Sequence, residues 1–192
     1  DNNMSNFTDF FPAAGGGGGA IPKYQEFTSS GTFTPTQALI DAGGRVSYFV
    51  VAGGQRGSSG VPYDGGAGGE VEYGYMTLTS TTGCTITIGS GGSGSNGAVG
   101  TSSSVAFSSA GGIDITANGG TGYGLGKNWG STFWNQTPYG SNTAFCGVNN
   151  FGKGGGGIYS GGGVGTPSPN SGCGSKGNVN AASGFTRITW FE

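Results

Sequence analysis

Glycine constrains this chain more than any other feature: 47 of its 192 residues are glycine, concentrated in residues 53–69, 89–100, 111–126 and 152–165. Fixing a glycine backbone costs more entropy than fixing any other residue, so several ordered glycine loops in one domain are expensive. Two interpretations are open. The tracts are mobile loops, or they are polyglycine II-like extended segments whose N–H and C=O groups bond to neighbouring segments. We expect the second.

Short runs rich in β-branched and aromatic residues separate the tracts and predict strands. They cover residues 24–27, 31–34, 45–52, 70–80, 85–88, 104–107, 113–116 and 185–191. The first two resemble a hairpin with Ser29 and Ser30 between them, and no apolar helical period lasts three turns. The sequence therefore predicts an all-β, β-sandwich-like domain of short antiparallel strands with packed glycine-rich segments and almost no helix.

The chain divides into a lead-in or attachment segment, residues 1–26, and a glycine-rich β domain, residues 27–192. The lead-in contains Phe7, Phe10 and Phe11, followed by a run of glycines at 15–19. A glycine run of this kind is typical of a flexible linker.

Charge and composition exclude several classes of function. Only 8% of the residues are charged and the formal net charge is −2, so the chain lacks the basic excess that nucleic-acid binding needs. No run of about 18 apolar residues is present, which argues against membrane insertion. A high aromatic content, 12%, argues against disorder.

Catalysis, cofactors and metals have little support. The chain has no histidine, and the G-x-G-x-x-G match at residues 92–97 is not followed by a helix start. Glu70 and Glu72 have strand spacing that suits a carboxylate pair, but we interpret them as part of an exposed strand face. Asp114 is interpreted as a strand or turn carboxylate. We expect no enzyme activity, no cofactor and no metal site.

Three cysteines, Cys84, Cys146 and Cys173, give an odd count without zinc spacing. Cys146 and Cys173 could form a disulfide in an oxidising setting, or all three could be buried thiols.

The stretch 123–151 is the strongest candidate for a binding site, because aromatic and amide side chains alternate there with almost no charge. Rings stack on a ligand while amides fix hydrogen bonds, a combination suited to saccharide or protein recognition. The alternative is a satellite core beneath a long loop. The predicted site residues are Tyr123, Trp129, Phe133, Trp134, Asn135 and Tyr139.

An ordered set of motifs resembles the glycine-rich distal (tip) domain of tailed-bacteriophage tail-fibre receptor-binding proteins. Residues 27–35, FTSSGTFTP, resemble the opening of that domain; the runs 46–54, 75–79, 85–89 and 184–190 follow in the same order. The resemblance covers residues 27–192, and the stretch 123–151 departs from it.

This resemblance implies an adhesin at the distal end of a virion tail fibre, assembled in the host cytoplasm. The implied partners are a bacterial surface polysaccharide or outer-membrane protein and other fibre subunits, usually in a homotrimer. Two other classes remain open: a structural virion or filament protein that uses glycine packing for assembly, and an ice-binding protein, which would need a flat repetitive face.

Overall fold

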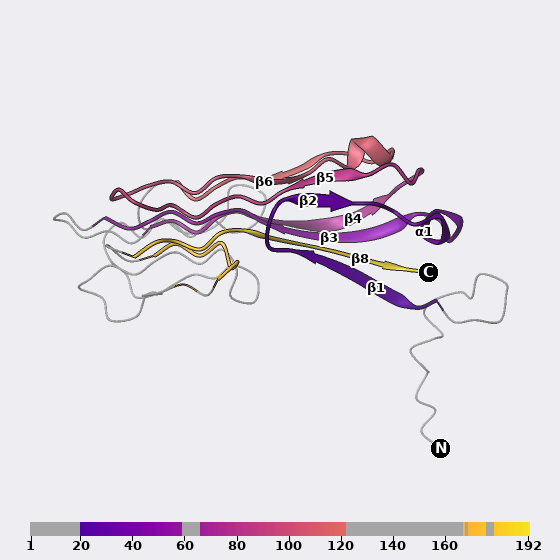
Figure 1. Cartoon of the computed structure of the whole chain (residues 1–192), viewed down its shortest axis with the longest axis horizontal. Coiled ribbons are helices and arrows are strands. Elements are labelled where there is room, and N and C mark those ends of the chain that lie inside the picture. Colours follow the sequence, from indigo (N-terminus) through magenta and orange to yellow (C-terminus); the bar gives the residue numbers. More distant parts are fainter. Residues whose placement is uncertain (1–19, 59–65, 122–166, 168, 176–178) are drawn as a thin grey trace, which may run out of the picture.

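The computed structural model describes residues 20–58, 66–121, 167, 169–175 and 179–192. This part of the chain forms an elongated molecule in which two facing β-sheets continue into a set of extended glycine-rich segments (Figure 1). The C-terminus and helix α1 lie at the sheet end, opposite the glycine-rich end.

Both sheets are antiparallel and four-stranded. The first, sheet A, contains in spatial order β1 (Pro22–Phe27), β8 (Phe185–Phe191), β3 (Arg45–Val51) and β4 (Val71–Thr77). The second, sheet B, contains β2 (Gly31–Phe33), β5 (Cys84–Thr87), β6 (Ser103–Val105) and β7 (Ile115–Ala117). Helix is confined, in the described residues, to α1 (Gln37–Asp41) and the 3-10 turn η2 (Phe107–Ala110). The prediction of an all-β, two-sheet fold with almost no helix is confirmed.

Neither described helix has the length and apolar character needed to span a bilayer.

The predicted hairpin near the start of the chain is wrong. β1 pairs with β8 in sheet A, whereas β2 pairs with β5 in sheet B, so the chain changes sheets between Phe27 and Gly31. Phe27 and Phe33 are both buried in the core between the sheets, and the Ser30 hydroxyl accepts a hydrogen bond from the Ile88 N–H (3.0 Å) beyond β5. Burial of one ring from each strand, rather than a local turn, decides the pairing. β1 also extends across the expected boundary at residue 26.

The core follows from the alternation of the strands. In β3, Val46 and Val50 point inward and are almost fully buried, while Arg45 on the other face is exposed. Phe33 of β2 packs against Trp190 of β8 with ring centroids 5.3 Å apart and planes at 60°, which joins the two sheets. Burying a ring of this size contributes about 2–3 kcal/mol, so a few such residues hold the sheets together.

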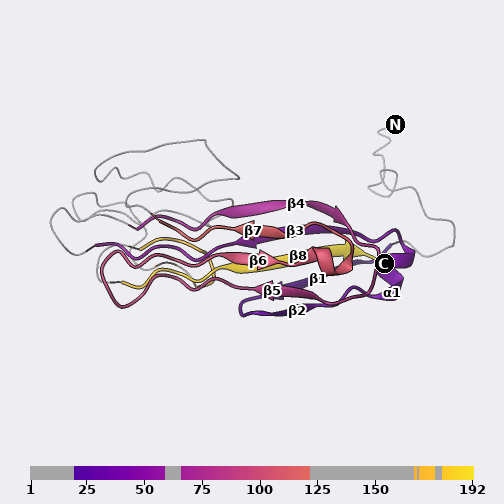
Figure 2. The same cartoon turned by 90° about the horizontal axis from the view of Figure 1, so that it is seen from above.

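Beyond the strands, extended segments run side by side and form what we call the glycine bundle (Figure 2). Backbone hydrogen bonds link segments that are distant in sequence: Gly53 N–H donates to the Thr101 carbonyl (3.0 Å), and Gly120 N–H donates to the Gly53 carbonyl (2.8 Å). Gly54 N–H donates to Ala182 (2.9 Å). The bundle consists of residues 52–57, 66–70, 89–92, 98–101, 118–120, 172–175 and 181–184.

Glycine is required in the bundle by close approach of backbones. A Cβ added at most of its glycines would lie 1.8–2.4 Å from a carbonyl oxygen of another segment. Real Cβ atoms essentially never come within 3.0 Å of such an atom. The positions with this approach are Gly53, Gly54, Gly66, Gly69, Gly89, Gly91, Gly92, Gly100, Gly119, Gly120, Gly172, Gly174 and Gly184. A polyglycine II conformation of these segments stays a prediction, and the predicted tract 152–165 lies outside the described residues.

Candidate functional site

The predicted site residues all fall within residues 122–166, which lie outside the described part of the chain. Their grouping into one site therefore stays a prediction. They are Tyr123, Trp129, Phe133, Trp134, Asn135 and Tyr139.

Residues that border the undescribed segments 59–65, 122–166 and 176–178 meet at the end of the glycine bundle that lies away from the sheets. Ser175 N–H donates to the Gln55 carbonyl (3.1 Å), and Gly66 N–H donates to the Ser175 carbonyl (2.8 Å). The Ser175 hydroxyl donates to the Val179 carbonyl. Gly120 approaches the same place, since a Cβ there would lie 2.8 Å from the Gln55 nitrogen. One hydrogen-bonded platform therefore carries the second border of residues 59–65, both borders of 176–178 and the first border of 122–166.

The buried side chain of Gln55 connects the segments of this platform through hydrogen bonds. Its side chain is 3% exposed, yet both ends of the amide are used. Nε2 donates to the Gly97 carbonyl (3.0 Å), and Oε1 accepts from the Ala67 N–H (3.2 Å). A buried amide that is hydrogen-bonded through both its nitrogen and its oxygen fixes three segments relative to one another.

Arg56 is the next residue and joins the outermost turns. Its Nη1 donates to the Gly94 carbonyl (2.7 Å) and to Asn180 Oδ1 (3.3 Å), while its backbone N–H donates to the Ala98 carbonyl (2.9 Å). Within the described residues the guanidinium forms no ion pair. The far end of the bundle therefore carries a positive charge held by neutral acceptors.

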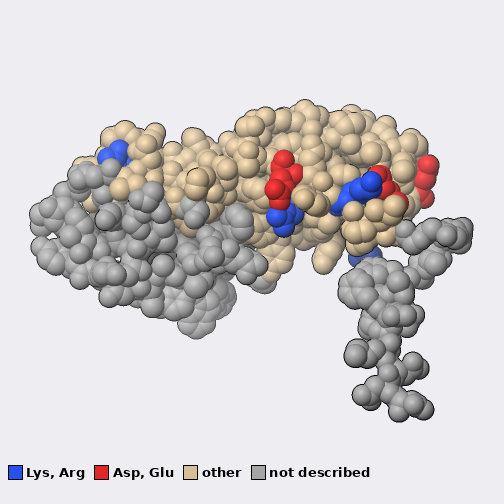
Figure 3. Space-filling model, turned by 60° about the horizontal axis from the view of Figure 1, so that its bottom comes forward, with Lys and Arg blue, Asp and Glu red and all other residues tan. Residues whose placement is uncertain are grey.

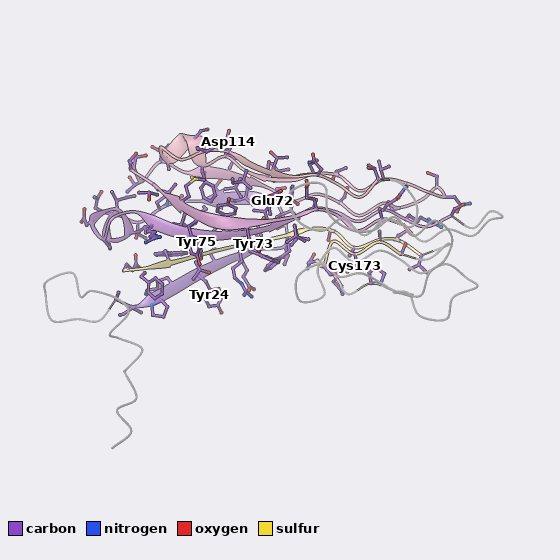
Figure 4. The ribbon with its side chains drawn as sticks, turned by 180° about the vertical axis from the view of Figure 1, so that it is seen from behind. Tyr24, Glu72, Tyr73, Tyr75, Asp114 and Cys173 are labelled. Atoms are coloured by element: carbon purple, nitrogen blue, oxygen red, sulfur yellow. The ribbon has the colours of Figure 1, made fainter. Side chains whose placement is uncertain are left out.

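A second candidate surface, which sequence reasoning missed, is the outer face of sheet A. The strand register places Tyr24, Thr189, Ser47 and Tyr75 in one line across β1, β8, β3 and β4. We call these four residues the tyrosine row. Tyr24 is 68% and Tyr75 74% exposed, and Figure 4 shows both on the same side of the sheet, with Asp114 on the opposite side of the molecule.

Each tyrosine of the row has an arginine guanidinium over its ring. The Arg187 guanidinium carbon lies 5.8 Å from the centroid of the Tyr24 ring, and that of Arg45 lies 5.8 Å from the Tyr75 ring. Arg187 also pairs with Glu26, whose Oε1 accepts from Nε at 2.8 Å. These contacts are within cation–π range and orient the rings at the surface.

Charge elsewhere on the described surface is sparse. Most of the described surface visible in Figure 3 belongs to uncharged residues; acidic and basic side chains gather at a few places over the sheet end, and basic atoms are also visible at the glycine-rich end. The two arginines of the outer face are therefore a marked local feature.

The Glu70 and Glu72 pair lies at the β4 edge of sheet A. Glu70 Oε2 accepts from Asn118 N–H (2.8 Å) and from its Nδ2 (2.6 Å), which connects the start of β4 to the glycine bundle. Glu72 pairs with Val50 in the register and is half-buried. Burial first, and the neighbouring Glu70 second, raise the pKa of Glu72. Burial, and next Glu72, raise the pKa of Tyr48.

Asp114 serves the turn between η2 and β7. Its Oδ1 accepts from the Ser108 N–H at 2.8 Å. Hydrogen bonding to Ser108 lowers the pKa of the carboxyl group. Its role in the described structure is to hold this turn.

Two of the three cysteines fall in the described part of the chain, and both are buried. Burial is the largest cause that raises the pKa of the Cys84 thiol. Cys146 lies outside the described residues, so its pairing with Cys173 stays a prediction.

No group of three or more His, Cys, Asp or Glu side chains within the described ranges could hold a metal ion.

The fold places this chain in the all-β class, as two antiparallel sheets extended by a glycine bundle. Comparison with models of protein families, with curated proteins and with solved structures finds no match. The resemblance of the sequence to tail-fibre tip domains therefore stays a prediction.

Proposed function

We propose that this chain is a receptor-binding (adhesin) module at the distal end of a phage tail fibre. It recognises a bacterial surface polysaccharide or an outer-membrane protein, without catalysis, through aromatic and amide residues of the stretch 123–139. Other fibre subunits, in a homotrimer, carry it on the virion.

One observation carries the proposal: the borders of several undescribed segments converge on the hydrogen-bonded platform around Gln55, opposite the C-terminus. Binding residues are commonly carried on loops that a fixed scaffold positions. In the bundle the scaffold is made of backbone hydrogen bonds, so segments attached to its end can change in sequence without disturbing a side-chain core.

The alternative is a structural virion or filament protein in which the glycine bundle serves assembly. Backbone hydrogen bonding between segments would support that function equally well, because it could continue into a neighbouring molecule. The two functions differ in whether the isolated chain binds cells selectively.

The test is binding of the fluorescently labelled chain to a panel of bacterial strains, with a Trp129→Ala/Trp134→Ala variant beside it. The matched control is Ile113→Ala, since Ile113 is 75% exposed and lies between η2 and β7, away from the bundle platform. Circular dichroism checks that all three proteins fold.

Strain-selective binding that is lost only in the tryptophan variant supports the proposal. Selective binding that the variant retains supports an adhesin whose site lies elsewhere. Binding to no strain, together with self-assembly of the chain, supports the structural alternative.

A further inference from the structure

We propose that the tyrosine row, with Arg45 and Arg187, is a binding site for an acidic polysaccharide. This site goes beyond the proposed function, because it lies on the outer face of sheet A and uses none of residues 122–166. It consists of Tyr24, Thr189, Ser47 and Tyr75 across four strands, with one arginine against each tyrosine.

The two tyrosines supply stacking surfaces for sugar rings. They are 68% and 74% exposed although they stand on regular strands, where an aromatic side chain would gain from burial. The guanidinium groups at 5.8 Å favour one orientation of each ring before any ligand arrives. A ring held in place in the free protein loses little conformational freedom on binding.

The centre of the row is polar, and its short side chains form a floor between the two tyrosine rings. Ser47 and Thr189 are both half-buried and carry small hydroxyl side chains, and the Ser47 hydroxyl donates to the Thr189 carbonyl at 3.4 Å. The two tyrosine positions are three strand spacings apart, or roughly 14 Å. A chain of several sugar units therefore spans the row, with its faces on the rings and its hydroxyls over the floor.

The charge of this face selects an acidic chain. Arg45 forms no ion pair with any described residue, and Arg187 pairs with Glu26, the single acid that the described strands place on this face. A planar guanidinium binds a carboxylate through parallel hydrogen bonds. Two arginines against one glutamate leave an excess positive charge on a chain whose net charge is −2.

The composition of the row favours a saccharide over a protein partner. Protein interfaces are also enriched in tyrosine and arginine, but there these residues cluster in a contiguous core that is fully buried and has few charges. Here hydroxyl side chains separate the two rings of the row, and an arginine stands beside each one. Tyr73, which is 45% exposed on the same face of β4, adds a further ring that carries a hydroxyl group. Separate stacking positions around a hydroxyl floor match a hydroxyl-rich ligand.

The experiment is calorimetric titration of the intact chain with alginate oligosaccharides, which are polyuronates, and with neutral dextran oligosaccharides. We expect binding of alginate, weakened by high salt because the charges are at the surface, and weaker or no binding of dextran. Tyr24→Ala/Tyr75→Ala should lower the alginate affinity by about tenfold or more through loss of both stacking surfaces. Arg45→Gln should lower the affinity for alginate by a larger factor than that for dextran, because it removes the positive charge as well as the contact with the Tyr75 ring.

Two controls separate binding from folding. Tyr24→Phe/Tyr75→Phe retains the rings and should bind alginate within about twofold of the wild type, and Ile113→Ala should bind as the wild type does. Trp129→Ala/Trp134→Ala should also retain alginate binding, so a failure of the proposed adhesin function is visible separately in the cell assay.

Three results would overturn the inference. The wild type binds no alginate; it binds dextran as strongly as alginate; or the folded Tyr24→Ala/Tyr75→Ala variant binds alginate like the wild type. A concentration-dependent dimer that this double variant abolishes, without alginate binding by the wild type, would identify the face as a protein interface instead.

Discussion

Replacement of Gly53 by alanine tests whether close backbone approach stabilises the glycine bundle. The new Cβ would lie 2.0 Å from the Ser90 carbonyl oxygen and 2.5 Å from its carbon. Since real Cβ atoms essentially never come within 3.0 Å of such atoms, one segment must move by about 1 Å.

That movement affects a local network of backbone hydrogen bonds. Ser90 accepts from Thr101 N–H (3.0 Å), Gly53 N–H donates to Thr101 (3.0 Å), and Gly53 accepts from Gly120 N–H (2.8 Å). Leaving a buried backbone group unsatisfied costs about 1–3 kcal/mol. Disruption of two of these bonds therefore lowers the free energy of unfolding by about 2–6 kcal/mol, out of a typical total of about 5–15 kcal/mol.

The matched control is Gly31→Ala, because the nearest atom to a Cβ at Gly31 is a Phe27 ring carbon at 3.5 Å, an ordinary contact. This variant should stay within about 0.5 kcal/mol of the wild type. Chemical denaturation followed by circular dichroism measures both, and the melting temperature of Gly53→Ala should fall by about 10 °C. Equal stabilities of the two variants would refute the reasoning.

Three further predictions concern single side chains. Gln55→Leu should lower the free energy of unfolding by about 2 kcal/mol, because the buried Ala67 N–H loses its acceptor; an unchanged denaturation midpoint would contradict this. Glu72→Gln should raise the melting temperature at pH 7, because burial and Glu70 raise the pKa of Glu72 and make its ionised form unfavourable in the folded state. This gain should grow as the pH rises from the ordinary glutamate pKa of about 4.3 through the folded value, and disappear well below 4.3, where the carboxyl is protonated in both states; a gain that persists in acid would point to another cause. Phe33→Ala should cost about 3–5 kcal/mol through the cavity left against Trp190, and a loss below 1 kcal/mol would show that the core closes around the gap.

Local sequence was enough to predict individual strands but not their partners. β3 and β8 match the predicted runs closely, because β-branched and aromatic residues fill both of their faces. The partner of β1 is β8, at the other end of the chain, and this pairing has no local signal. The hairpin error follows directly, because residues 29–30 fit a turn and equally fit a crossing between sheets.

Composition likewise predicted only part of the bundle. Residues 181–184 belong to it, although Ala181, Ala182 and Ser183 contain no glycine run. A segment joins the bundle when its backbone can reach carbonyl and N–H partners, and small side chains suffice for this. The glycines are needed only where a Cβ would meet a carbonyl.

The tyrosine row could not be found in the sequence for a related reason. Tyr24 and Tyr75 are distant along the chain, and Tyr24 lay in the expected lead-in segment. Only the registers of β1, β8, β3 and β4 bring them into one line. Alternation within residues 70–80 indicated which side chains share a face of β4, but not what lies beside them.

The topology of the glycine bundle has a consequence for how the chain folds. Gly54 bonds to Ala182, Gly69 to Gly172, and Glu70 to Asn118, so the bundle closes only when residues from nearly the whole length of the chain have arrived. Contacts of such long sequence separation slow folding, because the entropy of loop closure is lost before the bonds form. Strands β1 and β8 pair over a similar separation, but glycine segments lose more conformational entropy on ordering than the β-branched strands do, so we expect the bundle to form late, on sheets that are already paired. Interactions made after the transition state slow unfolding rather than speed folding. The glycine bundle would then contribute chiefly to kinetic stability, which is measured as a slow unfolding rate. Gly53→Ala should raise that unfolding rate and leave the folding rate almost unchanged.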